Sequence, residues 1–350
     1  MALLMESFEK KIHEAMNGIT FLYFSYGPAH IHYRAIFSIM SLALNYRFKP
    51  TDAILIYTNN TDLFEAPCRG LPVNIQSIGE SDVIQMMGGM DLIHRVKIGI
   101  ISRAAQLRPL CKLIYVDADT FFTSPVEGLI EKINPNQSAM HCFEFCLNTV
   151  SPEYLPRPTT YEFSRMVLNA GYYDTSGPVS LNSMILNSWN AGLIGLDPVN
   201  FKHLPFVVGL TDQWYKKVNY HGAEQFAFSF VLETKTSIVT AEAYCCHYWF
   251  HVKKRIVDES LAQASKEGFF SLPHEKSNGK VAALIQYFQN AFQGHAYFLH
   301  NDAIVSFLEG NYWKGVWKSL KIIVLKPSIA WRMFKDAGYY TKIKLFAKNE

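Results

Sequence analysis

The sequence predicts an α/β fold in which helices cover both faces of a central sheet. Two observations support this prediction. Short apolar runs alternate with segments of helical periodicity along the first 122 residues, as expected for strands buried under helices. One of these runs ends in two aspartates, and ligands of such sheets bind at the carboxyl ends of the strands. With 350 residues, 49% of them hydrophobic, the chain can bury a large core.

The N-terminal part supplies the alternating elements in order. Residues 19–26 are mostly β-branched and aromatic and end at Gly27-Pro28, which indicates a strand followed by a loop. Apolar residues recur at helical intervals over 31–46. By the same criteria we predict strands at 19–26, 53–57, 73–78 and 112–116, and helices at 2–17, 31–46 and 92–107.

The second half of the chain is less regular. Residues 148–180 are rich in Pro, Tyr, Thr and Gly, which favours a long irregular insertion near the site. A polar stretch at 271–280 predicts a break before a helical C-terminal region. Between these, we predict strands at 140–145 and 193–196, a helix at 223–232, and two short strands within 237–249.

Asp117 and Asp119 stand directly after the apolar run 112–116, with the small Ala118 between them. Side chains two positions apart on an extended chain point to the same side. A turn just past the strand can therefore aim both carboxylates at one divalent cation. Because so short a motif also occurs by chance, its weight comes from the strand before it and from motifs downstream.

Composition excludes several classes of protein. Charged residues among the first 14 interrupt any apolar signal core, so we expect no secretory signal peptide. No apolar run reaches the roughly 18 residues of a membrane-spanning helix. The six cysteines form neither CxxC pairs nor a regular framework, and we expect them to be buried, reduced thiols of a cytosolic protein.

Four segments resemble those of nucleotide-sugar glycosyltransferases of the GT-A fold, and most of all those of glycosyltransferase family 8. They are LIYVDADTFF at 113–122, WNAGLIGLD at 189–197, AEQFAFS at 223–229 and HYWFHVK at 247–253. The resemblance implies a GT-A type Rossmann-like mixed sheet with helices on both faces. It also implies a catalytic domain over 1–257, followed by a helical extension over 258–310.

The last of these segments fits the family's C-terminal motif in part. That motif has a His, an aromatic residue, and a Lys six positions after the His, as His247, Tyr248 and Lys253 do here. Phe250 replaces the usual Gly, and Lys254-Arg255 replace the usual Pro-Trp. His251 is an alternative candidate for the role of His247.

The implied reaction explains why such residues are needed. Cleaving a sugar–diphosphate bond produces an oxocarbenium-like sugar and a highly charged leaving group, which a divalent cation neutralises. The resemblance makes Asp117, Asp119 and His247 the protein ligands, and this donor set suits Mn²⁺ or Mg²⁺. Lys253 would place a further charge on the diphosphate. The donor would be a UDP-hexose.

Three further residues correspond to positions around the donor sugar. Asn190 resembles the family residue that contacts sugars in the site, and Glu224-Gln225 match an acidic–Gln pair whose Gln lies near the reacting carbon. The second acid of the family's triplet is Phe226 here, so either Glu224 or Glu144 is left as a base or nucleophile. An ordinary turn and a solvated helix start remain alternative interpretations of these segments.

The predicted ends of the first two strands, and the helix before the aspartates, are expected to surround the nucleotide. Lys97 resembles the family's phosphate-facing Lys, although Arg95 and Arg103 compete for that role and all three also fit a solvated helix face. The residues expected to bind the nucleotide sugar are Ser25, Tyr26, Thr58, Asn59, Lys97, Asp117, Ala118, Asp119 and Lys253.

The C-terminal segment 311–350 has a composition of its own. It holds eight Lys, one Arg, one Asp and one Glu, a net charge of +7, whereas residues 1–310 carry −4. Trp313, Trp317 and Leu320 recur at helical spacing among lysines. Aromatic and basic residues favour anionic membrane surfaces, and nothing else in the chain indicates nucleic-acid binding. A packed helix with a basic outer face is the alternative.

We therefore expect a hexosyltransferase that acts with retention on a saccharide acceptor, which the membrane-binding segment suggests is lipid-linked, at the cytoplasmic face of the inner membrane. Two other classes fit less well. Haloacid dehalogenase-type phosphatases also begin with an apolar strand followed by DxD. They require Thr or Val at the position of Phe121, and their motif lies near the first strand, whereas two or three predicted strands precede it here. A non-catalytic membrane scaffold predicts broken metal ligands, whereas Asp117, Asp119 and His247 are all present.

Overall fold

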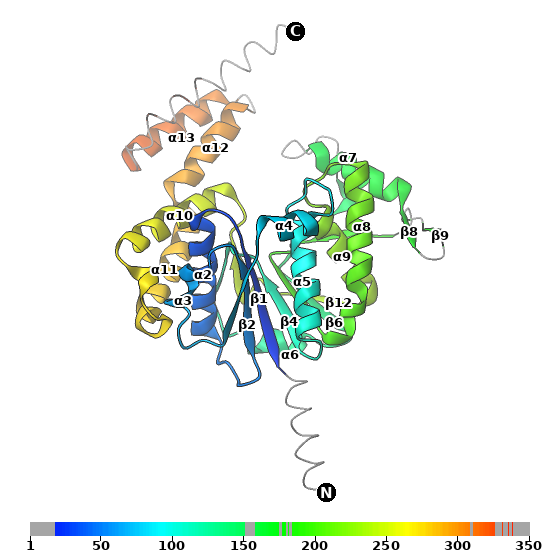
Figure 1. Ribbon diagram of the computed structural model, residues 1–350. Coiled ribbons are helices and arrows are strands. Elements are labelled where there is room, and N and C mark those ends of the chain that lie inside the picture. Colours follow the sequence, from blue (N-terminus) through cyan, green and yellow to red (C-terminus); the bar gives the residue numbers. More distant parts are fainter. Residues whose placement is uncertain are drawn as a thin grey trace, which may run out of the picture. The chain divides into compact units, whose positions relative to one another are not determined.

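The computed structural model describes residues 18–150, 158–174, 177–179, 181, 184–308, 311–325, 331, 335 and 338 (Figure 1). The predicted helix at 2–17 lies outside these residues, as does most of the basic segment after residue 325. The chain forms two compact units. The first comprises residues 1–247 and 261–281, and the second comprises 248–260 and 282–350.

A seven-stranded sheet forms the centre of the first unit. Its strands lie in the order β12-β6-β11-β4-β1-β2-β3, and within the described residues only β11 runs antiparallel to its neighbours. The bounds are β1 Ile19–Ser25, β2 Ala53–Thr58, β3 Val73–Ser77, β4 Lys112–Val116, β6 Gln137–Met140, β11 Leu193–Leu196 and β12 Ser237–Thr240. The strands predicted at 19–26, 53–57, 73–78, 112–116 and 193–196 are confirmed.

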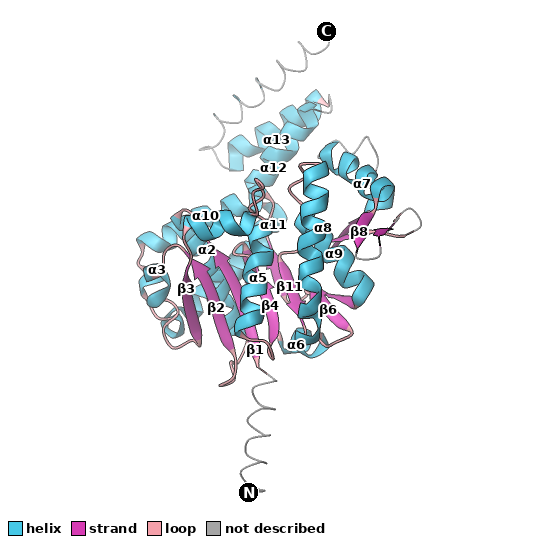
Figure 2. Cartoon of the chain, turned by 45° about the vertical axis from the view of Figure 1, so that its right-hand side comes forward, coloured by secondary structure: helices cyan, strands magenta, loops and turns pink. Residues whose placement is uncertain are grey.

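Helices cover both faces of this sheet, as Figure 2 shows. Neighbouring residues of a strand point to opposite faces, and β1 illustrates this. Leu22 belongs to the apolar cluster that contains the buried residues of α5 (Arg95–Leu107). The hydroxyl of Tyr23, on the other face, shares a hydrogen bond of 3.3 Å with the Ser38 hydroxyl of α2 (Ala29–Asn45). The predicted class, an α/β fold with helices on both faces of a mostly parallel sheet, is confirmed.

The remaining elements of the first unit pack around this framework. The helices are α3 Asp62–Glu65, α4 Glu80–Met87, α6 Glu127–Lys132, α7 Pro158–Ala170, α8 Leu204–Lys217 and α9 Ala223–Lys235, with 3-10 turns at Leu147–Thr149, Pro198–His203 and Phe269–Ser271. Three small antiparallel sheets pair β5 (Thr120–Phe122) with β13 (Cys245–His247), β7 (Phe143–Cys146) with β10 (Asn187–Trp189), and β8 (Tyr172–Asp174) with β9 (Gly177–Val179).

The single strand predicted at 140–145 is wrong, because the chain changes partners there. β6 pairs with β11 and β12 in the main sheet, whereas β7 pairs with β10 outside it. Between them, the backbone of 141–142 exchanges hydrogen bonds with Asn190, from His141 N to Asn190 O (3.0 Å) and from Asn190 N to Cys142 O (2.7 Å). The run predicted as one strand is therefore divided, and its two ends belong to different sheets.

Two further predictions about irregular segments are also wrong. The stretch 148–180 contains the helix α7, whose Phe163 and Val167 are fully buried at i, i+4 spacing. Pro158, Thr159, Thr160 and Tyr161 form the first turn of this helix, and they made the segment resemble a loop in the sequence. The polar stretch 271–280 is mostly helical, because α11 (His274–Gly294) begins within it, and only Leu272 and Pro273 separate this helix from the preceding 3-10 turn. The first turns of α11 carry consecutive polar residues because most of these positions are exposed or half-exposed.

In the second unit, helices pack through aromatic and small residues. α10 (His251–Lys266) and α11 contribute residues to both units, and α12 (Ala296–Leu308) and α13 (Tyr312–Leu325) belong to the second. α13 lies against α12 at Gly315, where a β carbon would approach Phe307 Cε1 to 2.8 Å. Among the described helices, none combines the length and apolar character that crossing a bilayer requires.

Candidate metal-binding site

The two aspartates lie in the tight turn that joins β4 to β5, at the carboxyl end of the sheet. Three hydrogen bonds fix this turn. The backbone N–H of Asp117 donates to Gly192 O (2.9 Å), and the hydroxyl of Thr120 donates to Asp117 O (2.9 Å). Thr120 in turn shares a 2.7 Å hydrogen bond with Ser38 of α2. These bonds hold the backbone segment that carries both carboxylates.

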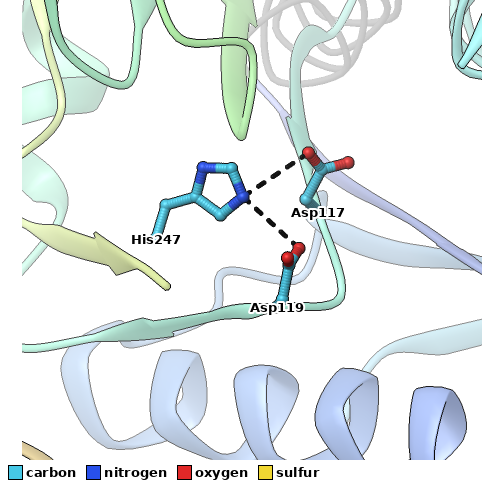
Figure 3. A group of neighbouring side chains, drawn as sticks. All are labelled: Asp117, Asp119 and His247. Atoms are coloured by element: carbon cyan, nitrogen blue, oxygen red, sulfur yellow. Dashed lines mark ion pairs between the residues drawn. The ribbon is translucent and has the colours of Figure 1, made fainter. Parts of the chain in front are cut away.

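His247 reaches this turn through strand pairing. β13 runs antiparallel to β5 and places His247 opposite Thr120, next to Asp119. Its Nε2 lies 3.4 Å from Asp119 Oδ1 and 3.9 Å from Asp117 Oδ2 (Figure 3). The side chains of His247 and Asp119 are 6% and 13% exposed, and that of Asp117 is 22% exposed. Residues 128 positions apart thus converge on one point.

The three residues fit a metal ion. Each offers one ligand atom, and these atoms all lie within 4.8 Å of one another. Two atoms bound to one small divalent cation at about 2.1 Å stand at most about 4.2 Å apart, so only a slight contraction is needed. Two carboxylates and one imidazole form a donor set that divalent metals accept. The cluster can therefore bind a metal ion.

Both oxygens of Asp117 have further partners inside the protein. The Tyr115 hydroxyl donates to Oδ1 (2.8 Å), and Lys97 Nζ donates to Oδ2 (3.2 Å). Burial, reinforced by the nearby charge of Asp117, raises the pKa of Tyr115 well above its ordinary value, so the hydroxyl remains a donor at neutral pH. Tyr115, two positions before Asp117 on the same side of the strand, is a site residue that the sequence analysis missed.

Lys97 lies in a buried ion pair beneath the aspartates. Its ammonium is 3.0 Å from Glu224 Oε1 and donates to Ala191 O at 3.0 Å. Burial by itself lowers the pKa of Lys97, but the carboxylates of Asp117 and Glu224 outweigh that effect and hold the pKa above its ordinary value. Glu224 is only 2% exposed, so the interpretation of this residue as a solvated helix start is wrong. Its carboxylate faces Lys97.

A second set of hydrogen bonds surrounds Glu144. Its Oε1 accepts from Asn190 Nδ2 (3.0 Å), and its Oε2 accepts from Gln225 Nε2 (2.7 Å) and Ser188 Oγ (3.1 Å). Gln225 Oε1 accepts from the Ala191 backbone N–H (3.3 Å). Asn190 Oδ1 continues the chain to His247 Nδ1 (2.7 Å). The predicted residues Asn190 and Gln225 thus meet Glu144, and nothing in the sequence marked Ser188 as their neighbour.

The residues predicted to surround the nucleotide lie at the ends of β1 and β2. Ser25 and Thr58 are paired across the two strands and fully buried. Ser25 shares a 2.7 Å hydrogen bond with His32 Nδ1. Asn59 is exposed and accepts from the Gly27 N–H (3.0 Å), and Tyr26 is half-buried. Because β1 is parallel to β4, these residues share the sheet edge that carries Asp117.

The remaining candidate cations have other surroundings. Arg95 forms a salt bridge with Asp212 (2.6 Å), and Arg103 forms one with Asp82 (3.0 Å). Lys253 belongs to α10 in the second unit, where its Nζ lies 5.1 Å from the centre of the Phe292 ring. Its contact with a diphosphate stays a prediction.

Comparison with known proteins adds little to this geometry. No protein-family model and no curated protein sequence matches the chain. Among solved structures, the chain is similar to the crystal structure of mouse xyloside xylosyltransferase 1 in its apo form, with 12% sequence identity. The match covers 64% of this chain and 84% of the mouse protein, with a TM-score of 0.42.

Proposed function

We propose that the protein is a metal-dependent glycosyltransferase of the GT-A type, which transfers a hexose from a UDP-hexose to a saccharide acceptor. The observation that carries the proposal is the convergence of Asp117, Asp119 and His247 at the carboxyl end of the sheet. The four sequence segments that resemble glycosyltransferase family 8 support it, because each of them contributes at least one side chain to this one region.

The metal, Mn²⁺ or Mg²⁺, would be held by these three side chains and would neutralise the leaving diphosphate. The imidazole tilts the choice towards Mn²⁺. Lys97 supports the site from below, since its ammonium holds Asp117 Oδ2 at 3.2 Å and its position in a buried ion pair keeps that carboxylate in one orientation. Tyr115 holds the other oxygen of Asp117.

The residues around Glu144 would face the donor sugar. Family 8 enzymes retain the anomeric configuration, and we propose the same outcome here. Glu144 is the better candidate for the reacting carboxylate, because it is half-buried and its neighbour Gln225 is half-buried as well. Glu224 is 2% exposed and lies 3.0 Å from Lys97, so a sugar could reach it only if that ion pair were broken.

A direct test combines binding and turnover. Purified protein is screened with UDP-hexoses, with and without Mn²⁺, by thermal shift and by release of UDP. A ligand at 100 times its Kd should add about 2.7 kcal/mol to the free energy of unfolding. Asp119→Asn should abolish Mn²⁺-dependent transfer and leave the fold intact, since it keeps the shape and removes one anionic ligand. Turnover by this variant at the wild-type rate would overturn the proposed metal site.

We also propose that α13 attaches the protein to an anionic membrane surface at the cytoplasmic face of the inner membrane, which suits a lipid-linked acceptor. α13 turns its small residues inwards, with Gly315 and Ser319 buried. Ile322 is buried as well, but three large apolar residues lie on the outside, with Trp313 87%, Trp317 61% and Leu320 50% exposed. Exposed tryptophans beside lysines match the composition of interfacial helices.

Co-sedimentation with phosphatidylglycerol vesicles tests this attachment. Removal of residues 311–350 should release the protein from the vesicles and spare UDP-sugar binding, because the proposed donor residues all precede residue 254. If the shortened chain sediments like the full chain, the segment does not attach the protein to membranes.

A further inference from the structure

The orientation of the Asn190 side-chain amide is fixed from two sides. An ionised carboxylate only accepts hydrogen bonds, so the NH₂ group of Asn190 must face Glu144, at 3.0 Å from Oε1. A backbone N–H only donates, and that of Gly192 lies 3.0 Å from Asn190 Oδ1. The two neighbours require the same orientation independently of each other. Asn190 is 3% exposed, so water offers little alternative.

This orientation determines which nitrogen of His247 carries the proton. Asn190 Oδ1 can only accept, and it lies 2.7 Å from His247 Nδ1. Nδ1 must therefore be the N–H, and in the neutral imidazole the lone pair is then on Nε2. Nε2 is the nitrogen that faces Asp119 Oδ1 at 3.4 Å and Asp117 Oδ2 at 3.9 Å. The hydrogen-bonded chain thus presents the lone pair to the carboxylates.

We infer that Asn190 is a positioning residue, held by Glu144, that sets His247 in the tautomer able to bind the metal. The inference rests on the proposed function in that it takes a divalent metal as the ligand of the cluster. Histidines that bind metals commonly donate their second N–H to an oxygen atom, and loss of that partner typically weakens metal affinity by 10–100-fold. In this chain the oxygen is an amide whose own orientation depends on a carboxylate.

One pair of substitutions exchanges the donor and the acceptor of the hydrogen bond between residues 190 and 144 without changing the net charge. In Glu144→Gln/Asn190→Asp, the new amide can donate to the new carboxylate, which still accepts from Gly192 and His247. The oxygen of the new Gln can still accept from Gln225 and Ser188. By contrast, Asn190→Asp alone places two carboxylates about 3 Å apart, where they repel each other strongly. Asn190→Ala simply removes the acceptor for His247.

Nitrogen NMR of protein labelled with ¹⁵N-histidine reads the tautomer without any metal. The His247 signals are assigned by their absence from the spectrum of His247→Gln, and the spectra are recorded at alkaline pH. We expect the proton on Nδ1 in the wild type and in the double variant, and a mixture of tautomers in Asn190→Ala. A proton on Nε2 in the wild type, or an unchanged tautomer in Asn190→Ala, would overturn the inference.

Calorimetric titration with MnCl₂ measures the consequence for binding. We expect Asn190→Ala to weaken Mn²⁺ binding by about 10–100-fold and the double variant to return to within a factor of about three of the wild type. Thermal melts verify that each variant folds. If the wild type binds no Mn²⁺, the proposed function fails, whereas the tautomer result is decided by NMR alone. Equal Mn²⁺ affinity of Asn190→Ala and the wild type would contradict the positioning role.

Discussion

The imidazole of His247 lies directly against the backbone of Gly192. A β carbon at residue 192 would stand 2.0 Å from His247 Nδ1, and 2.5 Å from its Cε1 and Cγ. The side chain that approaches this glycine so closely is a proposed metal ligand. No side chain larger than hydrogen leaves the ring in place.

Gly192→Ala should accordingly displace His247 and weaken Mn²⁺ binding by at least about tenfold, as loss of a supporting contact does at other metal sites. The matched control is Gly209→Ala in α8, where nothing lies within 4 Å of the added carbon. That change should leave Mn²⁺ affinity unchanged and raise the free energy of unfolding by about 0.5–1 kcal/mol. Calorimetry with MnCl₂ compares the two variants, and equal affinities would show that the ring tolerates displacement.

The buried pair of Lys97 and Glu224 predicts a loss of stability that a second substitution relieves. Lys97→Met leaves the buried Glu224 carboxylate without its counter-charge, which should cost about 3–5 kcal/mol of the free energy of unfolding. Glu224→Gln in the same chain removes that charge, and we expect it to recover much of the loss. Urea denaturation of both variants gives the values. If Lys97→Met alone unfolds like the wild type, the ion pair contributes nothing to stability.

The strands and the position of the two aspartates were largely predictable from the sequence, since each depends on local patterns. β1, β2 and β4 are short apolar runs with clear ends, and Asp117 and Asp119 follow the last of them directly. The convergence of His247 with these aspartates followed from a resemblance of motifs. Its physical cause, the pairing of β13 with β5, was not visible, because antiparallel pairing over more than 100 residues leaves no local pattern.

The partners of charged residues could not be predicted. Lys97 was expected to face a phosphate, yet its ammonium lies between Asp117 and Glu224. Which side of a helix is buried can be read from periodicity, but which carboxylate meets a buried lysine depends on how two distant elements pack. The same holds for Glu144, whose contacts with Ser188 and Asn190 require the pairing of β7 with β10.

His247→Ala should abolish most Mn²⁺-dependent binding of UDP, because it removes one of three protein ligands. His251→Ala is the comparison that decides between the two candidate histidines. His251 is exposed at the start of α10, and we expect its removal to leave UDP binding within about threefold of the wild type, as for most surface substitutions. Calorimetric titration of UDP in the presence of Mn²⁺ measures both. A larger loss at residue 251 would transfer the ligand role to it.

Stability should decline at alkaline pH because of a buried thiol. Burial raises the pKa of Cys68 from 9.0 to about 12. Between these values the unfolded chain releases a proton that the folded chain retains, so rising pH favours unfolding. Below pH 9 the protonated Cys68 thiol makes its full contribution to the free energy of unfolding. That free energy then falls by about 1.4 kcal/mol per pH unit as the pH rises from 9 towards about 12.

Cys68→Ala removes this group and should flatten the dependence by the same amount. Urea denaturation at about pH 8, 9.5 and 11 gives the slope for each protein. Burial also raises the pKa of Cys245, so this thiol lowers stability at alkaline pH in the same way. It is present in both proteins. The comparison therefore concerns the difference of slopes rather than their absolute size. Parallel curves for wild type and variant would show that the Cys68 thiolate is tolerated in the folded state.

The exposed face of α13 predicts that membrane binding has two separable parts. Lys314 and Lys321 are exposed, and Lys321 Nζ lies 5.5 Å from the Trp317 ring centre. Exposed charges are screened by salt, whereas burial of indole rings in the lipid interface is not. Lys314→Gln/Lys321→Gln should therefore weaken the salt-sensitive part of vesicle binding, and Trp313→Ser/Trp317→Ser should weaken the part that survives at about 1 M salt.

The helix also offers a matched control for the lysine variant. Lys318 lies on the same helix, but its ammonium pairs with Asp302 of α12 at 3.3 Å, so its charge is already compensated. Lys318→Gln should consequently change binding less than either exposed lysine does. Co-sedimentation with phosphatidylglycerol and with phosphatidylcholine vesicles, at low and high salt, separates these effects. Equal binding of all variants would mean that this face of α13 does not contact lipid, and the membrane attachment would have to be sought elsewhere in the chain.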